Sequence, residues 1–230
     1  MVILGLVTLA IILVSGGEWV VRSSLFRVRY VSVVGARHET SAAVIAASGL
    51  SSHPPIIDVS AATLNQRLSR FAWIESVALT KHWPDRVVVT VTERTAVAVA
   101  FSATHHLVYV DSAGHDLGAA PLSANLPTLI YQSPRARTWP FRRAGRAAAY
   151  VASQLPVAFS RQVSRISVNA AGSVSLTMTT PVTFVLGPAS NLHAKFVSIA
   201  SVIAHARLVP GDIVDVSVPG SLAVTGGAPS

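Results

Sequence analysis

Residues 71–94 (FAWIESVALTKHWPDRVVVTVTER) alternate between apolar and small or polar side chains with a period of two. This alternation, rich in β-branched residues, predicts β-strands with one buried face. Pro84 and Asp85 interrupt the pattern at its centre, where proline suits the first central position of a type I turn. The stretch therefore predicts a β-hairpin, with Trp73 and Trp83 packed in the core and the turn. Its apolar face consists of Trp73, Val77, Leu79, Val87, Val89 and Val91.

Shorter elements precede the hairpin. Residues 26–35 (FRVRYVSVVG) predict a strand with a bulge, and residues 41–48 predict a helix that Gly49 ends. Asp58 or Ser60 is placed to cap a second helix. Residues 22–95 thus predict a β-α-α-β-β unit in which two helices cover one face of a sheet. The expected core is Val31, Val33, Val44, Ile45, Leu64, Leu68, Val77, Leu79, Val87, Val89 and Val91.

Residues 96–225 predict a second unit, a mixed domain with a mainly antiparallel sheet, so the fold class is α+β. Residues 226–230 are expected to form a flexible tail. The last helix places Leu192, Phe196, Ile199 and Ile203 on one apolar face. Helices are expected at 142–155 and 191–206, and strands at 97–101, 106–110, 163–168, 173–178, 182–186 and 213–218.

The N-terminus carries an apolar run, VILGLVTLAIILV at residues 2–14. Extended to residue 21 it reaches the length that spans a bilayer, and no later stretch is comparable, so residues 1–21 predict a single-pass transmembrane anchor. A cleaved signal peptide and a buried soluble helix are the alternatives. Because Arg22, Arg27 and Arg29 follow the run and no cation precedes it, we suspect that a basic cytoplasmic segment is missing and that Met1 is not the natural start.

Composition narrows the function only in part. The chain has no cysteine, which excludes disulfides, cysteine-ligated zinc and thiol nucleophiles. Its net charge of +8 suits nucleic acid, an anionic membrane surface or an acidic wall polymer. Charge alone does not choose among these partners.

No catalytic motif stands out. His105, His106, Asp111, His115 and Asp116 form a local His/Asp cluster, but they fall on a predicted hairpin and its loop, where polar residues are expected without a metal. We therefore expect no enzyme activity, no metal, no cofactor and no small-molecule substrate.

A basic segment at residues 135–146 carries five arginines. It could mimic a nucleic-acid patch, yet it equally suits phospholipid head groups or a solvated loop. We expect no nucleic-acid partner, because the chain is predicted to be anchored in a membrane.

The first unit resembles a POTRA domain, in particular that of the bacterial cell-division FtsQ/DivIB family. The resemblance rests on the VSVVG strand end at 31–35, the AWI segment at 72–74, the KHWP turn at 81–84 and the ER-x-x-VA end at 93–98. It continues less firmly into the second unit through VDSAG at 110–114, FVLG at 184–187 and the strand at 213–218, where Ser217 replaces the family's usual arginine. The matching family positions are Gly35, Asp58, Trp73, Trp83, Pro84, Glu93, Arg94, Asp111, Gly114, Gly187, Lys195 and Asp215.

The resemblance implies a non-enzymatic divisome scaffold at the septum, with its C-terminal domains outside the cytoplasm. It also implies partners of the FtsB/FtsL type, small bitopic coiled-coil proteins that add a strand to the sheet edge near the C-terminus. The edge is predicted at residues 213–218, continuing to Val224. The candidate partner-binding residues are Ile213, Val214, Val216, Val218, Ser221 and Val224.

Two other functions remain open. A POTRA-bearing protein of another envelope assembly or secretion system would need a long barrel after residue 94, which the predicted helices interrupt. A cell-envelope enzyme would need a convergent catalytic constellation.

Overall fold

The computed structural model describes residues 24–132, 142–221 and 223–226. The chain divides into two compact units, Met1–Arg94 and Thr95–Ser230. Each unit has its own buried core. The predicted anchor at residues 1–21 and residues 227–230 of the predicted tail at 226–230 lie outside the described residues. Within the described ranges, no helix is both long and apolar enough to cross a membrane.

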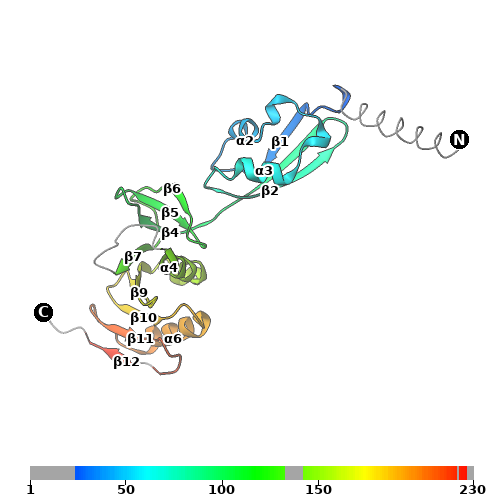
Figure 1. The fold of residues 1–230 in the computed structure, drawn as a ribbon. Coiled ribbons are helices and arrows are strands. Elements are labelled where there is room, and N and C mark those ends of the chain that lie inside the picture. Colours follow the sequence, from blue (N-terminus) through cyan, green and yellow to red (C-terminus); the bar gives the residue numbers. More distant parts are fainter. Residues whose placement is uncertain (1–23, 133–141, 222, 227–230) are drawn as a thin grey trace, which may run out of the picture. The chain divides into compact units, whose positions relative to one another are not determined.

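The first unit is a three-stranded sheet with two α-helices, in the predicted order β-α-α-β-β (Figure 1). The order of strands in the sheet is β1-β3-β2, with β1 parallel and β2 antiparallel to the central β3. Its elements are η1 Ser24–Phe26, β1 Tyr30–Val34, α2 Ser41–Ser48, η2 Leu50–Ser52, η3 Ile56–Asp58, α3 Ala61–Leu68, β2 Ile74–His82 and β3 Arg86–Glu93.

Local sequence explains where both helices begin. The Thr40 side chain accepts the Ala43 N–H at the start of α2, and the Ser60 side chain accepts the Thr63 N–H at the start of α3. Gly49 ends α2 with a φ of 80°, a left-handed value that glycine adopts without a Cβ penalty. Of the two predicted caps for the second helix, Ser60 is therefore correct, and Asp58 instead ends η3.

The core of the first unit forms as the alternation predicts except at Trp73, which was expected in it but is half-buried outside the cluster of core residues. All eleven expected residues belong to it, seven fully buried and Val31, Val33, Ile45 and Leu79 partly buried against them. The pattern did not reveal five further buried members, which come from irregular segments and strand ends: Val28, Leu50, Ile56, Val59 and Ile74.

The hairpin turn differs from the prediction in one respect. Trp83 is 53% exposed and contacts only the edge of the Phe26 ring among described aromatic side chains, with the centroids 5.8 Å apart. The expectation that Trp83 packs inside the unit is therefore wrong, since the turn projects beyond the core. The Trp83–Pro84 peptide bond is cis, a feature that the type I turn interpretation did not include.

The second unit is a nine-stranded sheet in the order β12-β11-β10-β9-β8-β7-β4-β5-β6. Figure 1 shows α4 and α6 on the same side of it. Buried residues alternate with half-buried ones along β9 and β10, so one face of these strands packs into the core and the other faces outward. Its elements are β4 Ala96–Phe101, β5 Leu107–Asp111, β6 Asp116–Ala119, β7 Thr128–Gln132, α4 Arg142–Gln154, α5 Val157–Ser160, β8 Val163–Asn169, β9 Val174–Met178, β10 Thr183–Gly187, α6 Leu192–His205, β11 Ile213–Asp215 and β12 Ala223–Thr225.

Two details of this unit correct the sequence prediction. On α6, Val202 is buried and Ile203 is 43% exposed, so the buried stripe steps by three residues after Ile199 rather than by four. The last strand was expected to run from 213 to 218. It ends instead at Asp215, and the chain then turns through Pro219 and Gly220 into the separate strand β12.

Gly35 gives a test of the first unit. Its φ is +92°, and an added Cβ would run into the backbone oxygen of Val91 on β3. We predict that Gly35→Ala lowers the free energy of unfolding of this unit by about 2–4 kcal/mol, because left-handed strain and a backbone clash combine. The measurement is calorimetric unfolding of the full chain.

Gly172→Ala is the matched control, since Gly172 has a similar φ of +83° but open space where the Cβ would lie. We expect Gly172→Ala to lower the free energy of unfolding by about 1 kcal/mol, from backbone strain alone. Equal losses for the two variants would show that the Gly35 contact is not restrictive.

Candidate protein-binding edge of the C-terminal sheet

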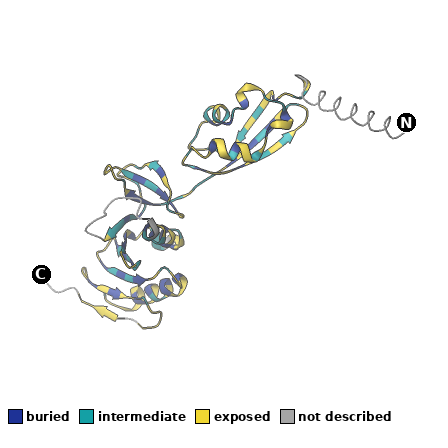
Figure 2. Ribbon diagram, viewed as in Figure 1, coloured by how far each residue is buried: buried dark blue, intermediate teal, exposed yellow. Residues whose placement is uncertain are grey.

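The β12 strand ends the nine-stranded sheet. It pairs antiparallel with β11, with Ile213 opposite Thr225, Val214 opposite Val224 and Asp215 opposite Ala223. On its other side no strand of the described chain is paired with it. All three β12 residues are exposed, whereas Val214 on β11 and Val216 just after it are fully buried (Figure 2).

The direction of the β12 backbone groups follows from β10 and β11, which pair in parallel. Thr183 N–H donates to Asp212 C=O at 2.9 Å, and Val216 N–H donates to Val185 C=O at 3.0 Å. Residues 212, 214 and 216 therefore turn their backbone groups toward β10, and the alternate residues Ile213 and Asp215 turn theirs toward β12. Ala223 and Thr225 are the β12 residues opposite these two, so Val224 directs its N–H and C=O outward.

The Val224 side chain continues the apolar face of the sheet. Directly opposed residues of an antiparallel pair share a face, so Val224 lies on the same face as buried Val214. Val224 is nevertheless 55% exposed. Among the described residues, β12 thus presents a backbone donor and acceptor without a partner strand, beside an exposed apolar side chain.

The other end of the same sheet is less open. In β6 the Asp116 side chain accepts the Gly118 N–H at 2.8 Å, and Gly118 has a φ of +104°. A charged residue and a left-handed glycine disfavour addition of another strand. β12 has the sequence Ala-Val-Thr and lacks both protections.

The six predicted partner-binding residues divide into two groups. Ile213, Val218, Ser221 and Val224 are exposed, and only Val224 lies on the terminal strand. Val214 and Val216 lie in the core, so their side chains are unavailable to a partner. The prediction that the edge runs along 213–218 is corrected, because β12 covers β11. The Pro219-Gly220 pair was the sequence signal for this reversal.

Lys195 on α6 lies near this edge, because its charge interacts with that of Asp215 on β11. Its side chain is buried, and Nζ donates to Pro188 C=O at 2.8 Å. Burial lowers the Lys195 pKa below its ordinary value, while the charge of Asp215 acts in the opposite direction. Hydrogen bonds from Ser217 outweigh desolvation and, with the Lys195 charge, lower the Asp215 pKa. Gly187, at φ +65°, leaves room for Ser217 beside it.

Asp212 is a structural residue that the sequence analysis missed. It is 5% exposed, and its Oδ2 accepts the Val209 N–H at 2.8 Å. Its backbone also accepts the Thr183 N–H, so it fixes the loop that leads from α6 into β11. The sequence signal for this role was the position of Asp212 directly before the predicted strand at 213–218.

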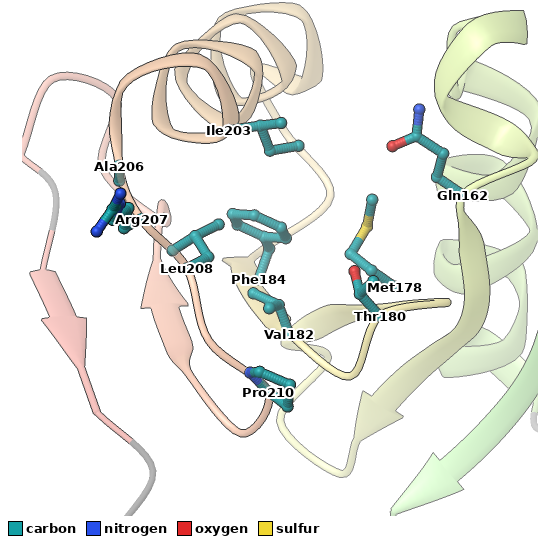
Figure 3. Close-up of a pocket in the computed structure, with 10 residues that line it drawn as sticks. All are labelled: Gln162, Met178, Thr180, Val182, Phe184, Ile203, Ala206, Arg207, Leu208 and Pro210. Atoms are coloured by element: carbon teal, nitrogen blue, oxygen red, sulfur yellow. The ribbon is translucent and has the colours of Figure 1, made fainter.

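A recess of about 380 Å³ lies beside the C-terminal end of α6 (Figure 3). Its floor is apolar, formed by Met178, Val182 and Phe184. Ile203 and Leu208 also line it, together with Arg207, and no acidic residue does. Such a recess can take apolar side chains of a partner.

Two members of the His/Asp cluster, Asp111 and His115, are hydrogen-bonded to each other in a turn. Asp111 is buried, and its Oδ1 accepts the N–H groups of Ala113 and His115 while Oδ2 lies 2.9 Å from His115 Nδ1. Gly114, with φ +86°, completes the turn between β5 and β6. Asp111 and Gly114 therefore shape a hairpin turn. Across the described ranges, no group of three or more His, Asp or Glu side chains is placed to hold a metal ion.

Glu93 connects the end of β3 to the loop after β1. Its Oε1 accepts the N–H groups of Arg37 at 2.7 Å and His38 at 2.9 Å, and Oε2 lies 2.8 Å from His38 Nδ1. The His38 ring stacks on Trp73 at 3.7 Å, and Trp73 C=O accepts the Arg94 N–H. The family-motif residues Trp73, Glu93 and Arg94 thus meet at the end of the first unit where the chain leaves it.

Comparison with known proteins finds a matching family and several relatives. Residues 26–94 match the family described as POTRA domain, FtsQ-type. The chain is 29% identical over 218 residues to the cell division protein FtsQ of Streptomyces bingchenggensis, covering 92% of this chain and 81% of that protein. It is 28% identical over 231 residues to FtsQ of Streptomyces collinus, covering 96% and 86%.

A third relative matches over a shorter stretch. The chain is 37% identical over 100 residues to FtsQ of Zymomonas mobilis, covering 43% of this chain and 30% of that protein. The first unit is thus an FtsQ-type POTRA domain. Similarity over nearly the whole chain supports its assignment to the FtsQ/DivIB family of bacterial cell division proteins.

Glu93 gives a pH-dependent prediction. Burial alone would raise its pKa, but the hydrogen bonds from Arg37 and His38 outweigh burial, so the pKa lies below the ordinary 4.5. The resulting stabilisation is complete above the unfolded-state pKa and is lost as the pH falls through the folded-state pKa. We expect Glu93→Gln to lower the free energy of unfolding by about 1–2 kcal/mol at neutral pH and by less in acid.

Urea unfolding over a pH series measures this difference. Glu75→Gln is the control, because Glu75 is an exposed carboxylate on β2 of the same unit. A deficit for Glu93→Gln that stays constant down to strongly acidic pH would contradict the assigned role of the carboxylate.

Proposed function

We propose that this chain is a non-enzymatic, single-pass membrane scaffold of the bacterial division machinery, concentrated at the septum. Its two described units lie outside the cytoplasm. Membership of the FtsQ/DivIB family supports the division role, and the apolar run at residues 2–14 supports the membrane attachment.

We further propose that the scaffold binds its partner by strand addition at β12. The outward N–H and C=O of Val224 are the single observation that carries this proposal, because a partner strand would satisfy both groups. The exposed Val224 side chain would be covered at the same time. By family resemblance the partners are FtsB/FtsL-type bitopic proteins.

The recess beside α6 is a second place for partner side chains. Its Leu208 and Pro210 belong to the loop that leads into β11, the neighbour of β12. A partner chain that flanks the added strand could place an apolar residue there. We assign the recess a supporting role, because side chains in a pocket add selectivity to the backbone contacts of an added strand.

Val224→Pro tests the edge directly. Proline removes the outward N–H of Val224, whereas the bonds between β11 and β12 come from Ala223 and Thr225. We expect partner affinity to fall by at least about tenfold, because one net hydrogen bond is lost and the proline ring obstructs the added strand. Binding of the purified full chain to the FtsB/FtsL pair in detergent is the measurement.

Val224→Thr is the matched control, since threonine keeps the N–H and the β-branched shape. It should bind within a few-fold of the unchanged protein. Full affinity of Val224→Pro with an intact fold would place the partner elsewhere. Proline at Val216 is a poorer test than at Val224, because the buried Val216 N–H bonds to Val185 and its loss would damage the core.

The division role has its own test. A fluorescent fusion of the full chain in dividing cells should form a band at midcell, and Val224→Pro should retain membrane signal. A uniform membrane signal for the unchanged protein would contradict the septal role regardless of what binds at β12.

A further inference from the structure

One end of the POTRA domain carries a cluster of exposed aromatic and apolar side chains, which we call the tip cluster. It consists of Leu25, Phe26, Tyr30, Trp83 and Arg86. Leu25 is 67% exposed, Tyr30 59% and Trp83 53%, and Phe26 is half-buried beneath them. These residues come from η1, the start of β1, the β2–β3 turn and the start of β3, which lie at the same end of the sheet (Figure 1).

Contacts join four members of the tip cluster in two pairs. The Trp83 ring meets Phe26 edge-on at 5.8 Å, and the Arg86 guanidinium lies over the Tyr30 ring at 5.7 Å. Asp85 C=O accepts the N–H groups of both Arg29 and Tyr30, which joins the start of β1 to the hairpin turn. The cluster is thus one preformed surface built from two distant parts of the sequence.

Basic side chains lie near these rings. The cationic residues Arg27, Arg29 and Arg86 are exposed, the His82 imidazole is exposed as well, and Lys81 is half-buried with its Nζ donating to Ile57 C=O. The nearby carboxylates are Asp85, half-buried in the turn, and Asp58, exposed at the end of η3. No Asp or Glu occurs between Glu18 and Glu39, so the chain that enters this end is purely basic.

Tryptophan, tyrosine and arginine beside leucine are the residues that favour the boundary between lipid head groups and water. Their rings and long stems are apolar while their polar ends stay hydrated. The exposed cations add attraction to anionic lipids. A bilayer surface therefore accounts for this combination of side chains without a protein partner.

The sequence also places this end of the domain close to the apolar run. Ten residues, 15–24, separate Val14 from Leu25. Even fully extended they span at most about 36 Å. The tip cluster is therefore within reach of the head groups if residues 2–14 lie in a bilayer.

We infer that the tip cluster is a membrane-contacting surface that rests Trp83, Tyr30 and Leu25 on the head-group layer of an anionic bilayer. This contact would restrict the orientation of the POTRA domain relative to the membrane. The inference rests on the membrane attachment proposed above and is independent of partner binding at β12.

Single labels test the contact cleanly, because the chain has no cysteine of its own. Full-length protein with His82→Cys carries an environment-sensitive fluorophore at the tip, in nanodiscs of mixed phosphatidylglycerol and phosphatidylcholine. Ser76→Cys is the matched control, exposed on the same strand six residues away, or about 20 Å. Quenching by a nitroxide attached to lipid head groups reports proximity to the bilayer.

We expect strong quenching at position 82, weak quenching at position 76, and a loss of quenching at 82 in pure phosphatidylcholine. Equal quenching at both positions would overturn the inference while leaving the anchor intact. So would a label at 82 that responds only when FtsB/FtsL-type proteins are added. Protein that does not remain with lipid would refute the anchor and this contact together.

Charge variants provide a second readout that does not depend on the label site. Arg29→Gln should lower the ratio of protein with its tip cluster on the bilayer to protein with its tip cluster in solution. We expect about a fivefold change at low salt, as for the loss of one cation near an anionic surface. Arg70→Gln, at an exposed position after α3, should leave the ratio unchanged. Equal effects of the two changes would show that charge acts through the whole domain and not through the tip.

Discussion

An open sheet always ends in backbone groups that have no strand to bond to, and this constraint governs the second unit. The parallel pairing of β10 with β11 fixes which residues of β11 face β12, and that choice fixes which residue of β12 faces outward. The two ends of the sheet meet the constraint differently. β6 carries Asp116 and a left-handed Gly118, while β12 presents Val224 without protection.

The POTRA domain is organised around β3, the central strand of its sheet. Residues at opposite ends of β3 have different tasks. At its C-terminal end the Glu93 carboxylate accepts hydrogen bonds from the N–H groups of Arg37 and His38 and so fixes the loop after β1. At its N-terminal end Arg86 lies over Tyr30 beside exposed Trp83. Both ends are hydrogen-bonded to the neighbouring strand or loop, but only the N-terminal end carries exposed aromatic side chains beside it.

The sequence predicted most of the fold because its strong patterns are local. Alternation along β2 and β3 identified the core of the first unit, and the Gly49 stop identified the end of α2. Strand β12 escaped prediction as a separate strand because three residues are too short to show a period, so the edge was expected to continue from 213–218 to Val224 without a reversal. Val202 and Ile203 differ by about 100° around a helix, so the sequence pattern could not decide which of them is buried. Lys195 lies three residues after Leu192 on the buried face of α6, but a cation there is not expected from an apolar pattern, because its burial depends on a carbonyl that the fold brings to it.

The outward-facing backbone of β12 also bears on the polarity of any chain that joins it. A single donor and acceptor pair, as Val224 offers, can bond an incoming strand running in either direction, since parallel and antiparallel ladders differ in how successive pairs are spaced. The edge by itself therefore selects the position of a partner but not its direction. Direction has to come from side chains on either flank of the added strand, so two partners with similar strands but reversed flanks would be told apart by those flanks alone.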